Sequence, residues 1–138
     1  MRLDFGRVFL VRAEYDSDII SFLVDFAKKH EVLAGTFTAI GALKCAKLGF
    51  YDQQKHEYFE SQLDTPQEIA SCMGNVSIKE GETFVHAHAV LGDEKGHVKA
   101  GHLLEGRVFA AEVHLIELLG EKFEREEDAV TGLYLWDI

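Results

Sequence analysis

The sequence predicts a single α+β domain in which a largely antiparallel β-sheet is flanked by helices. Three observations lead to this expectation: one amphipathic segment near the start, a series of short β-compatible runs after it, and glycine-containing turns between those runs. No linker, low-complexity tract or internal repeat interrupts the 138 residues, of which 47% are hydrophobic. We therefore expect residues 1–138 to form one domain around one core.

The amphipathic segment is the clearest helix of the chain. It follows an apolar run at residues 7–12 that is typical of a strand, and Asp16 or Ser17 can cap its start. We expect acidic residues in its first turn, and Lys28, Lys29 and His30 lie in its last turn, a charge order that suits the helix dipole. The positions at helical spacing that predict one packed face are Ile19, Leu23, Phe26 and His30.

The rest of the chain alternates between β-compatible runs and turns. The expected strands are residues 36–42, 44–51, 56–62, 69–78, 83–91, 97–102, 107–118 and 131–136. A polar turn at residues 52–55 joins two of them as a hairpin, and Pro66 favours a bend or a helical turn. The segment 121–128 holds five acidic and two basic residues, and we expect a solvated helical turn or loop there.

Composition excludes several classes of function. The chain has 24 Asp and Glu against 14 Lys and Arg, a net charge of −10, which disfavours charge-driven binding to nucleic acid. No apolar run approaches the roughly 20 residues that a membrane helix needs, and Asp4 and Arg7 interrupt the start, where a signal peptide would be apolar. The two cysteines, Cys45 and Cys72, predict free thiols in a reducing cytoplasm.

The sharpest feature is a histidine constellation that begins with T-F-V-H-A-H-A-V-L. In a strand, His86 and His88 point to the same face. If the next strand forms a hairpin with this one and Leu91 pairs with His97, then His102 lies opposite His86 and diagonal to His88. The three imidazoles would then share one face of the sheet.

Three neutral imidazoles are good ligands for Zn²⁺ and similar divalent metals. Three protein ligands leave a fourth coordination position for water or a substrate oxygen, as catalytic zinc sites do. We therefore identify His86, His88 and His102 as candidate metal ligands. Two alternatives stay open at this point: exposed strand histidines without a ligand, or histidines that bind an anion.

A second pair, Glu112 and His114, also shares one strand face. Glu112 could orient a ligating histidine or act as a general base on bound water, or both side chains could simply be exposed on an edge strand. No Ser-His-Asp or Cys-His arrangement is evident, and G-H-L-L-E-G lacks the Lys-Ser/Thr ending of a phosphate loop. The catalytic residues, if there are any, are otherwise undefined by the sequence.

Several of these motifs together resemble the plant and prokaryote conserved (PPC) domain family. They are T-A-I-G-A-L-K, F-V-H-A-H-A-V-L-G, K-A-G-H-L-L-E-G-R-V and A-E-V-H-L-I, and the resemblance covers residues 7–119. It implies an antiparallel sheet flanked by helices, assembly as a homotrimer, and a bound metal, usually taken as zinc. The residues that match the family's metal-associated histidines are His86, His88 and His102.

In land plants this domain follows an AT-hook, whose Arg-Gly-Arg-Pro core enters the minor groove. This chain has no such core, since its only proline, Pro66, follows Thr65. The resemblance is therefore to the stand-alone prokaryotic form, and we do not expect direct DNA binding. The fold is more distantly similar to that of acetolactate decarboxylase, a three-histidine zinc enzyme, which is an analogy of fold alone.

Two functions remain open from the sequence. The first is a small cytoplasmic, homotrimeric zinc-binding protein with a regulatory, ligand-sensing or DNA-associated role. The second is a metal-dependent hydrolase or decarboxylase that uses the open coordination position, with Glu112 as a candidate base. In both, a small-molecule ligand would bind at the metal, and the sequence does not decide whether the protein is an enzyme.

Overall fold

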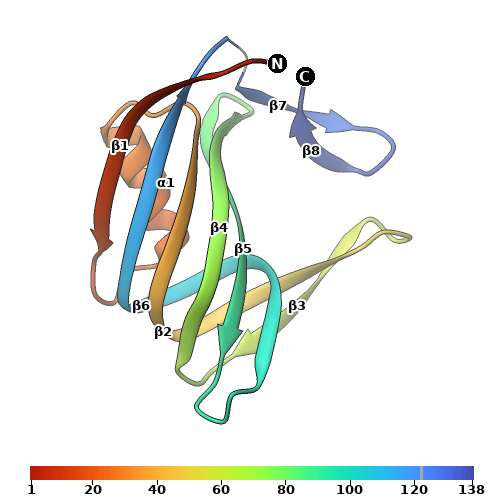
Figure 1. The fold of residues 1–138 in the computed structure, drawn as a ribbon. Helices are drawn as coiled ribbons and strands as arrows, with labels where there is room; N and C mark the ends of the chain where they lie inside the picture. The colour runs from red at the N-terminus through yellow and green to blue at the C-terminus, as the bar shows by residue number, and fades with distance from the viewer. Residues whose placement is uncertain (122) are drawn as a thin grey trace.

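A computed structural model describes residues 1–121 and 123–138 of the chain. Its elements are β1 (Asp4–Ala13), α1 (Ile19–Lys29), β2 (Gly35–Asp52), β3 (Glu57–Leu63), β4 (Gln67–Lys79), β5 (Glu82–Gly92), β6 (Val98–Leu119), β7 (Glu124–Asp128) and β8 (Leu133–Trp136). The sheet is largely antiparallel, as expected, but α1 is the only helix among the described residues (Figure 1). The expectation of several flanking helices is therefore corrected to one. No helix in the described part of the chain is long and apolar enough to span a bilayer.

The sheet curls until four of its strands close on one another. The strand order is β3-β2-β6-β5-β4-β7-β8, with β1 added beside β6 and a further pairing between β2 and β4. Because β2 pairs with both β4 and β6, and β5 lies between those same two strands, β2, β6, β5 and β4 form a ring. Within this ring, the β5–β6 hairpin places the start of β6 beside β5.

Two strands are longer than the sequence indicates, because glycines that were expected to end a strand lie within one. β2 covers both expected runs, 36–42 and 44–51, and Gly41 forms a bulge with a φ of 137°. A Cβ at Gly41 would collide with the carbonyl oxygen of Ala110 on β6. β6 likewise runs without a break through residues 103–106.

The cap of α1 is Asp18, rather than the expected Asp16 or Ser17. The Asp18 carboxylate accepts a hydrogen bond from the Ser21 backbone N–H at 2.8 Å. Asp16 is used elsewhere, since its carboxylate lies 2.6 Å from a nitrogen of both Lys44 and Arg107. The first turn of the helix then contains no acidic residue, which corrects the expected charge order at this end.

The core lies between α1 and the inner face of the curled sheet. Helix residues Ile19, Leu23 and Ala27 are 0–1% exposed. The largest fully buried sheet residues are Phe37, Leu43, Val76, Leu91, Val108, Val113 and Leu115. On the opposite, outer face, large apolar side chains stay exposed: Leu10 (81%), Ile40 (59%) and Met73 (61%).

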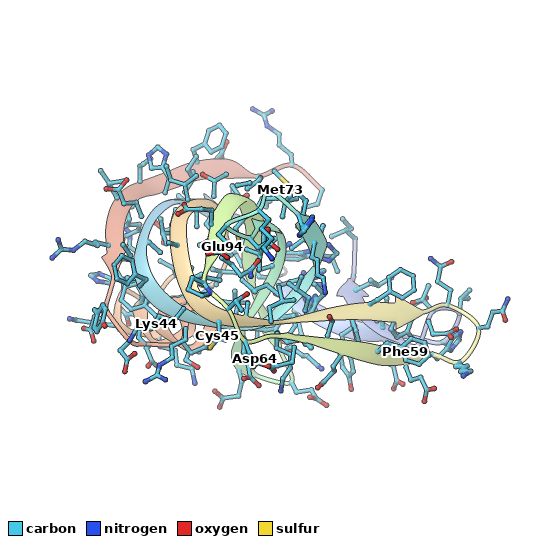
Figure 2. All side chains as sticks on the ribbon, turned by 90° about the horizontal axis from the view of Figure 1, so that it is seen from below. Lys44, Cys45, Phe59, Asp64, Met73 and Glu94 are labelled. Atoms are coloured by element: carbon cyan, nitrogen blue, oxygen red, sulfur yellow. The ribbon has the colours of Figure 1, made fainter. Side chains whose placement is uncertain are left out.

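Two hairpins extend beyond this core. The β2–β3 arm projects far from the body, with Phe59 near its end (Figure 2). The β7–β8 hairpin joins the sheet through a parallel pairing of β7 with β4. The helical turn or loop expected at 121–128 is therefore wrong for residues 124–128; residue 122 lies outside the described part. The side chains of this strand alternate, so that Arg125 is buried while Glu124 and Glu126 are exposed.

Candidate metal centre

Side chains of β5 alternate between the inner and outer faces of the sheet. Val85, Ala87 and Ala89 are buried toward the core, so His86 and His88 between them face outward. Close approach of β4 makes this possible, because a Cβ at Gly74 would collide with both the backbone oxygen of His86 and the ring of Phe37. The two histidines are therefore held on the outer face by the packing beneath them.

The hairpin between β5 and β6 brings the third histidine to the same face, in a register two residues from the expected one. His88, rather than His86, lies opposite His102, and the first pair is Gly92 with Val98. His97 belongs to the turn, where its backbone N–H donates to the Asp93 carboxylate and its carbonyl oxygen accepts from the Asp93 N–H. Because side chains alternate with a period of two, a shift of two residues keeps all three histidines on one face.

The three imidazoles form one cluster. Each offers a ring nitrogen, and these atoms lie within 4.8 Å of one another. Ring centroids are 5.1 Å apart for His86 and His88, 5.0 Å for His86 and His102, and 5.6 Å for His88 and His102. His88 is exposed, whereas the other two are half-buried.

The surroundings keep two of these rings neutral. Burial, followed by the neighbouring His102, His88 and Arg125, lowers the pKa of His86 to about 4. Burial and His88 also lower the pKa of His102. Neutral imidazoles at pH 7 present lone pairs to a metal with no proton to displace.

A ring nitrogen of His102 indicates most directly that these residues fit a metal. Its Nδ1 is buried and has no hydrogen-bond partner among the described residues. Tyr58 from β3 lies beside this ring, with centroids 5.3 Å apart. A buried polar atom without a partner is unfavourable, and coordination to a metal held by the cluster would remove that penalty. The residues present therefore fit a divalent metal with imidazole ligands.

Space opens on two sides of the cluster. One cavity of about 390 Å³ is lined by His86 and His88 together with Met73 and Asn75 of β4. A second, of about 400 Å³, is lined by His86 and His102. A small molecule could thus approach the histidines from either side.

Other residues singled out in the sequence are not part of this cluster. Glu112 and His114 are exposed on β6, in register with Arg12 and Leu10 of β1, and the structure does not bring them together with the three histidines. Within one chain Glu112 thus lies outside the cluster, and its role as an orienting group or a base stays a prediction. Both cysteines are free, and burial raises the pKa of Cys72 to about 11, which makes its thiol unreactive.

The sequence reasoning missed the residues around the second cavity. Arg125 lies in a segment dominated by acidic residues, and Lys79 and Tyr58 belong to no motif. The one available signal was the alternation of Glu124, Arg125 and Glu126, which is compatible with a strand that has one buried side.

The fold and the cluster together define a small curled-sheet protein with an outward-facing three-histidine centre. Comparison with known proteins agrees with this class: the profile of the Plants and Prokaryotes Conserved (PCC) domain, written PPC above, matches residues 2–119. The chain belongs to this family, which confirms the resemblance seen in the sequence. A search of curated proteins finds no match.

Solved structures extend the comparison. A metal-containing protein from Archaeoglobus fulgidus is 41% identical, with a TM-score of 0.94 over 98% of this chain and 96% of that one. A PPC protein from Pyrococcus horikoshii is 42% identical, with a TM-score of 0.95 over 99% and 95% of the two chains. A protein from Bacteroides thetaiotaomicron, provisionally named as DNA-binding, is 24% identical, with a TM-score of 0.87 over 98% and 96%, and shows the fold alone.

Proposed function

We propose that this protein is a zinc-binding PPC domain protein whose metal is held by His86, His88 and His102. The observation that carries the proposal is the convergence of three ring nitrogens within 4.8 Å, one ring having a buried nitrogen without a partner. Imidazole ligands favour zinc over magnesium or calcium, which prefer oxygen. The similar Archaeoglobus fulgidus protein, which is metal-containing, supports the same assignment.

The role that fits this centre best is ligand sensing or regulation in the cytoplasm. Three protein ligands leave a coordination position open, and the cavity lined by His86 and His102 gives small molecules access to it. The free thiols of Cys45 and Cys72 support a reducing compartment.

We propose that the protein assembles as a homotrimer through the outer face of its sheet. Register places Leu10, Thr38, Met73 and His88 in one cross-strand row, with His114 between the first two. Leu10 and Met73 are 81% and 61% exposed, so this row offers apolar surface for a second copy to cover. Light scattering should give three times the chain mass, and a monomer at micromolar concentration would refute this part of the proposal.

An enzyme is the second candidate, favoured by the open cavities beside the cluster. A bound zinc would polarise a carbonyl group or lower the pKa of a water molecule, as hydrolases and decarboxylase-like enzymes require. His86, His88 and His102 would hold it. Within one chain Glu112 lies outside the cluster, so the geometry offers no support for the base that the sequence suggested, and the sensing role ranks first.

Neither the charge of the chain nor its similarity to solved structures supports direct DNA binding. The net charge is −10, and affinity for duplex DNA depends on positive charge facing the phosphates. The similarity to a structure with a DNA-binding name is at 24% identity and concerns the fold. A DNA-associated role would therefore need a partner protein.

Elemental analysis tests the metal assignment. The purified protein, dialysed against zinc, should hold close to one zinc per chain, and His102→Ala should lose it. His97→Ala is the matched control, because His97 lies exposed in the turn before the same strand, outside the cluster and outside the row proposed as the trimer interface. Full zinc occupancy in the His102→Ala protein would refute the assignment.

A further inference from the structure

The second cavity beside the histidines has walls from three separate parts of the chain. It has a volume of about 400 Å³, within the range of small-molecule sites. Its lining includes His86 and His102 at the cluster, Tyr51 and Tyr58 from the β2–β3 arm, and Arg125 and Tyr134 from the β7–β8 hairpin.

A specific contact between the two hairpins encloses this space. The Tyr51 hydroxyl donates to the backbone oxygen of Thr131 at 2.6 Å. Gly132 lies next to it, so close that an added Cβ would be 3.0 Å from the Tyr51 oxygen and 3.1 Å from His56 Nδ1. The β2–β3 arm and the β7–β8 turn, which emerge from different ends of the sheet in Figure 1, therefore meet over the cavity.

Arg125 is a buried cation in this wall without an acidic partner. It is 5% exposed. Its hydrogen bonds go to three neutral oxygens: the Ser77 hydroxyl at 2.8 Å, the Asn75 amide at 2.7 Å and the Tyr134 carbonyl at 3.0 Å. A guanidinium has five N–H groups, so two remain for another acceptor. No carboxylate of the described residues forms an ion pair with it, although the chain has 24 acidic residues for 14 basic ones.

A second cation, Lys79, shares the Phe84 ring with Arg125. Its Nζ is 3.9 Å from the centroid of the Tyr134 ring and 5.5 Å from that of Phe84. Arg125 Cζ is also 5.5 Å from the Phe84 centroid, and 4.9 Å from that of Trp136. Aromatic faces attract cations but do not neutralise them, so two positive charges face one cavity in an acidic protein.

We propose that this cavity binds a small organic carboxylate, with the anionic group held by Arg125 and Lys79 and the apolar part against the aromatic rings. A planar carboxylate matches the remaining N–H groups of a guanidinium and removes the unpaired buried charge. Because His86 and His102 line the same space, the ligand would lie beside the proposed zinc site. The inference thus rests on the proposed function and assigns the class of ligand to it.

The single tryptophan provides a direct measurement. Trp136 packs on Arg125, so its fluorescence reports an anion bound to that guanidinium. Metal-free protein is titrated with sodium hexanoate, with the neutral isostere hexanamide, and with inorganic phosphate. We expect saturation by hexanoate with a dissociation constant of about 1–10 mM, as its size allows, and at least about tenfold weaker responses to the other two. An equal response to hexanamide, or tighter binding of phosphate, would overturn the proposal.

Substitutions locate the binding site. Arg125→Gln should abolish the response, but this residue also ties β7 to β4. Lys79→Gln is therefore the decisive variant, because the Lys79 side chain contacts aromatic rings and has no hydrogen bond to any described residue. We expect Lys79→Gln to weaken hexanoate binding by about fivefold or more. Lys95→Gln, in the exposed β5–β6 turn, is the matched control and should bind as the wild type does. Unchanged affinity in Lys79→Gln would overturn the proposal.

Zinc content, measured on the same samples, separates this inference from the proposed function. Zinc bound at one per chain without saturable hexanoate binding would refute the carboxylate site and leave the metal site standing. Hexanoate binding to a protein that takes up no zinc would refute the metal site and support the carboxylate site.

Discussion

The region beside α1, called the helix side, and the region beside the three histidines, called the histidine side, differ in whether their charged side chains have partners of opposite charge. Beside α1, Arg7 donates to the buried Glu117 through its backbone N–H and through two guanidinium nitrogens, and Asp16 binds both Lys44 and Arg107. Beside the histidines, Arg125 has only neutral partners.

The difference indicates which region stabilises the fold and which is prepared for a ligand. Breaking a paired charge removes stability that the protein holds on its own. Arg125 has no acidic partner, and the Nδ1 of His102 has no hydrogen-bond partner among the described residues. These two groups would gain such a partner when a ligand or a metal binds. The contrast predicts that substitutions on the helix side will change stability and leave ligand binding intact. Substitutions of His102 or Lys79, which do not tie strands together, should do the reverse.

The largest expected effect comes from the core beneath α1. Leu23→Ala removes a side chain that is 1% exposed, and we expect a loss of about 2–5 kcal/mol in the free energy of unfolding. Zinc per folded chain should not change, because Leu23 lies on the inner side of the sheet. Chemical denaturation and elemental analysis of the same preparation measure both quantities.

His102→Ala is the reciprocal variant. Without metal it removes an imidazole whose Nδ1 has no partner, so its free energy of unfolding should fall far less than that of Leu23→Ala. Added zinc should stabilise the wild type, by about 4 kcal/mol at a thousandfold excess over the dissociation constant, and should leave the variant unchanged. If Leu23→Ala lost zinc and His102→Ala kept it, the contrast between the two regions would be wrong.

A smaller effect, dependent on pH, is expected at Arg7. Hydrogen bonds from Arg7 lower the pKa of Glu117 to about 2, from 4.5. Between these values the unfolded chain holds more protons than the folded one, so the free energy of unfolding falls as the pH drops through this interval and is fully restored above pH 4.5. Arg7→Ala should lower the free energy of unfolding near pH 7 and should flatten this dependence.

The measurement is a series of denaturant melts between pH 2 and pH 7, on both proteins. Lys28→Ala is a suitable control, since its ion pair with Glu82 joins two exposed side chains. An undiminished slope between pH 2 and pH 4.5 in Arg7→Ala would assign the acid sensitivity to other groups.

Local periodicity explains what could be predicted from the sequence. The 3.6-residue repeat of Ile19, Leu23 and Phe26 predicts α1, and the alternation at His86 and His88 predicts their shared face. The face of His102 was also predictable, because a register error of two residues does not change it.

Specific contacts, rather than periodicity, determine the features of the fold and the site that were not predicted. The continuity of β2 through Gly41 depends on the close approach of Ala110, and the register of the hairpin depends on how Asp93 binds the turn. The Ala110 contact leaves no pattern in the local sequence, whereas the Asp93 contacts lie within the turn itself and the pairing chosen from the sequence overlooked them. The role of Arg125 likewise depends on Asn75 and Ser77, about fifty positions earlier in the chain.

The smallest expected effect concerns Glu112, which the sequence offered as a base or as an orienting group for the metal. Glu112 is exposed on the part of β6 that pairs with β1, where it lies in register with Arg12. Glu112→Gln should change the free energy of unfolding by less than about 0.5 kcal/mol and should leave both zinc and hexanoate binding as in the wild type. Calorimetric titration of each ligand is the sensitive measurement, because a group that oriented a ligating histidine would weaken zinc binding by about 10–100-fold when replaced. A loss of that size would mean that Glu112 reaches the cluster in the assembled protein, from a neighbouring copy, and the division between the two regions would then hold only within a single chain.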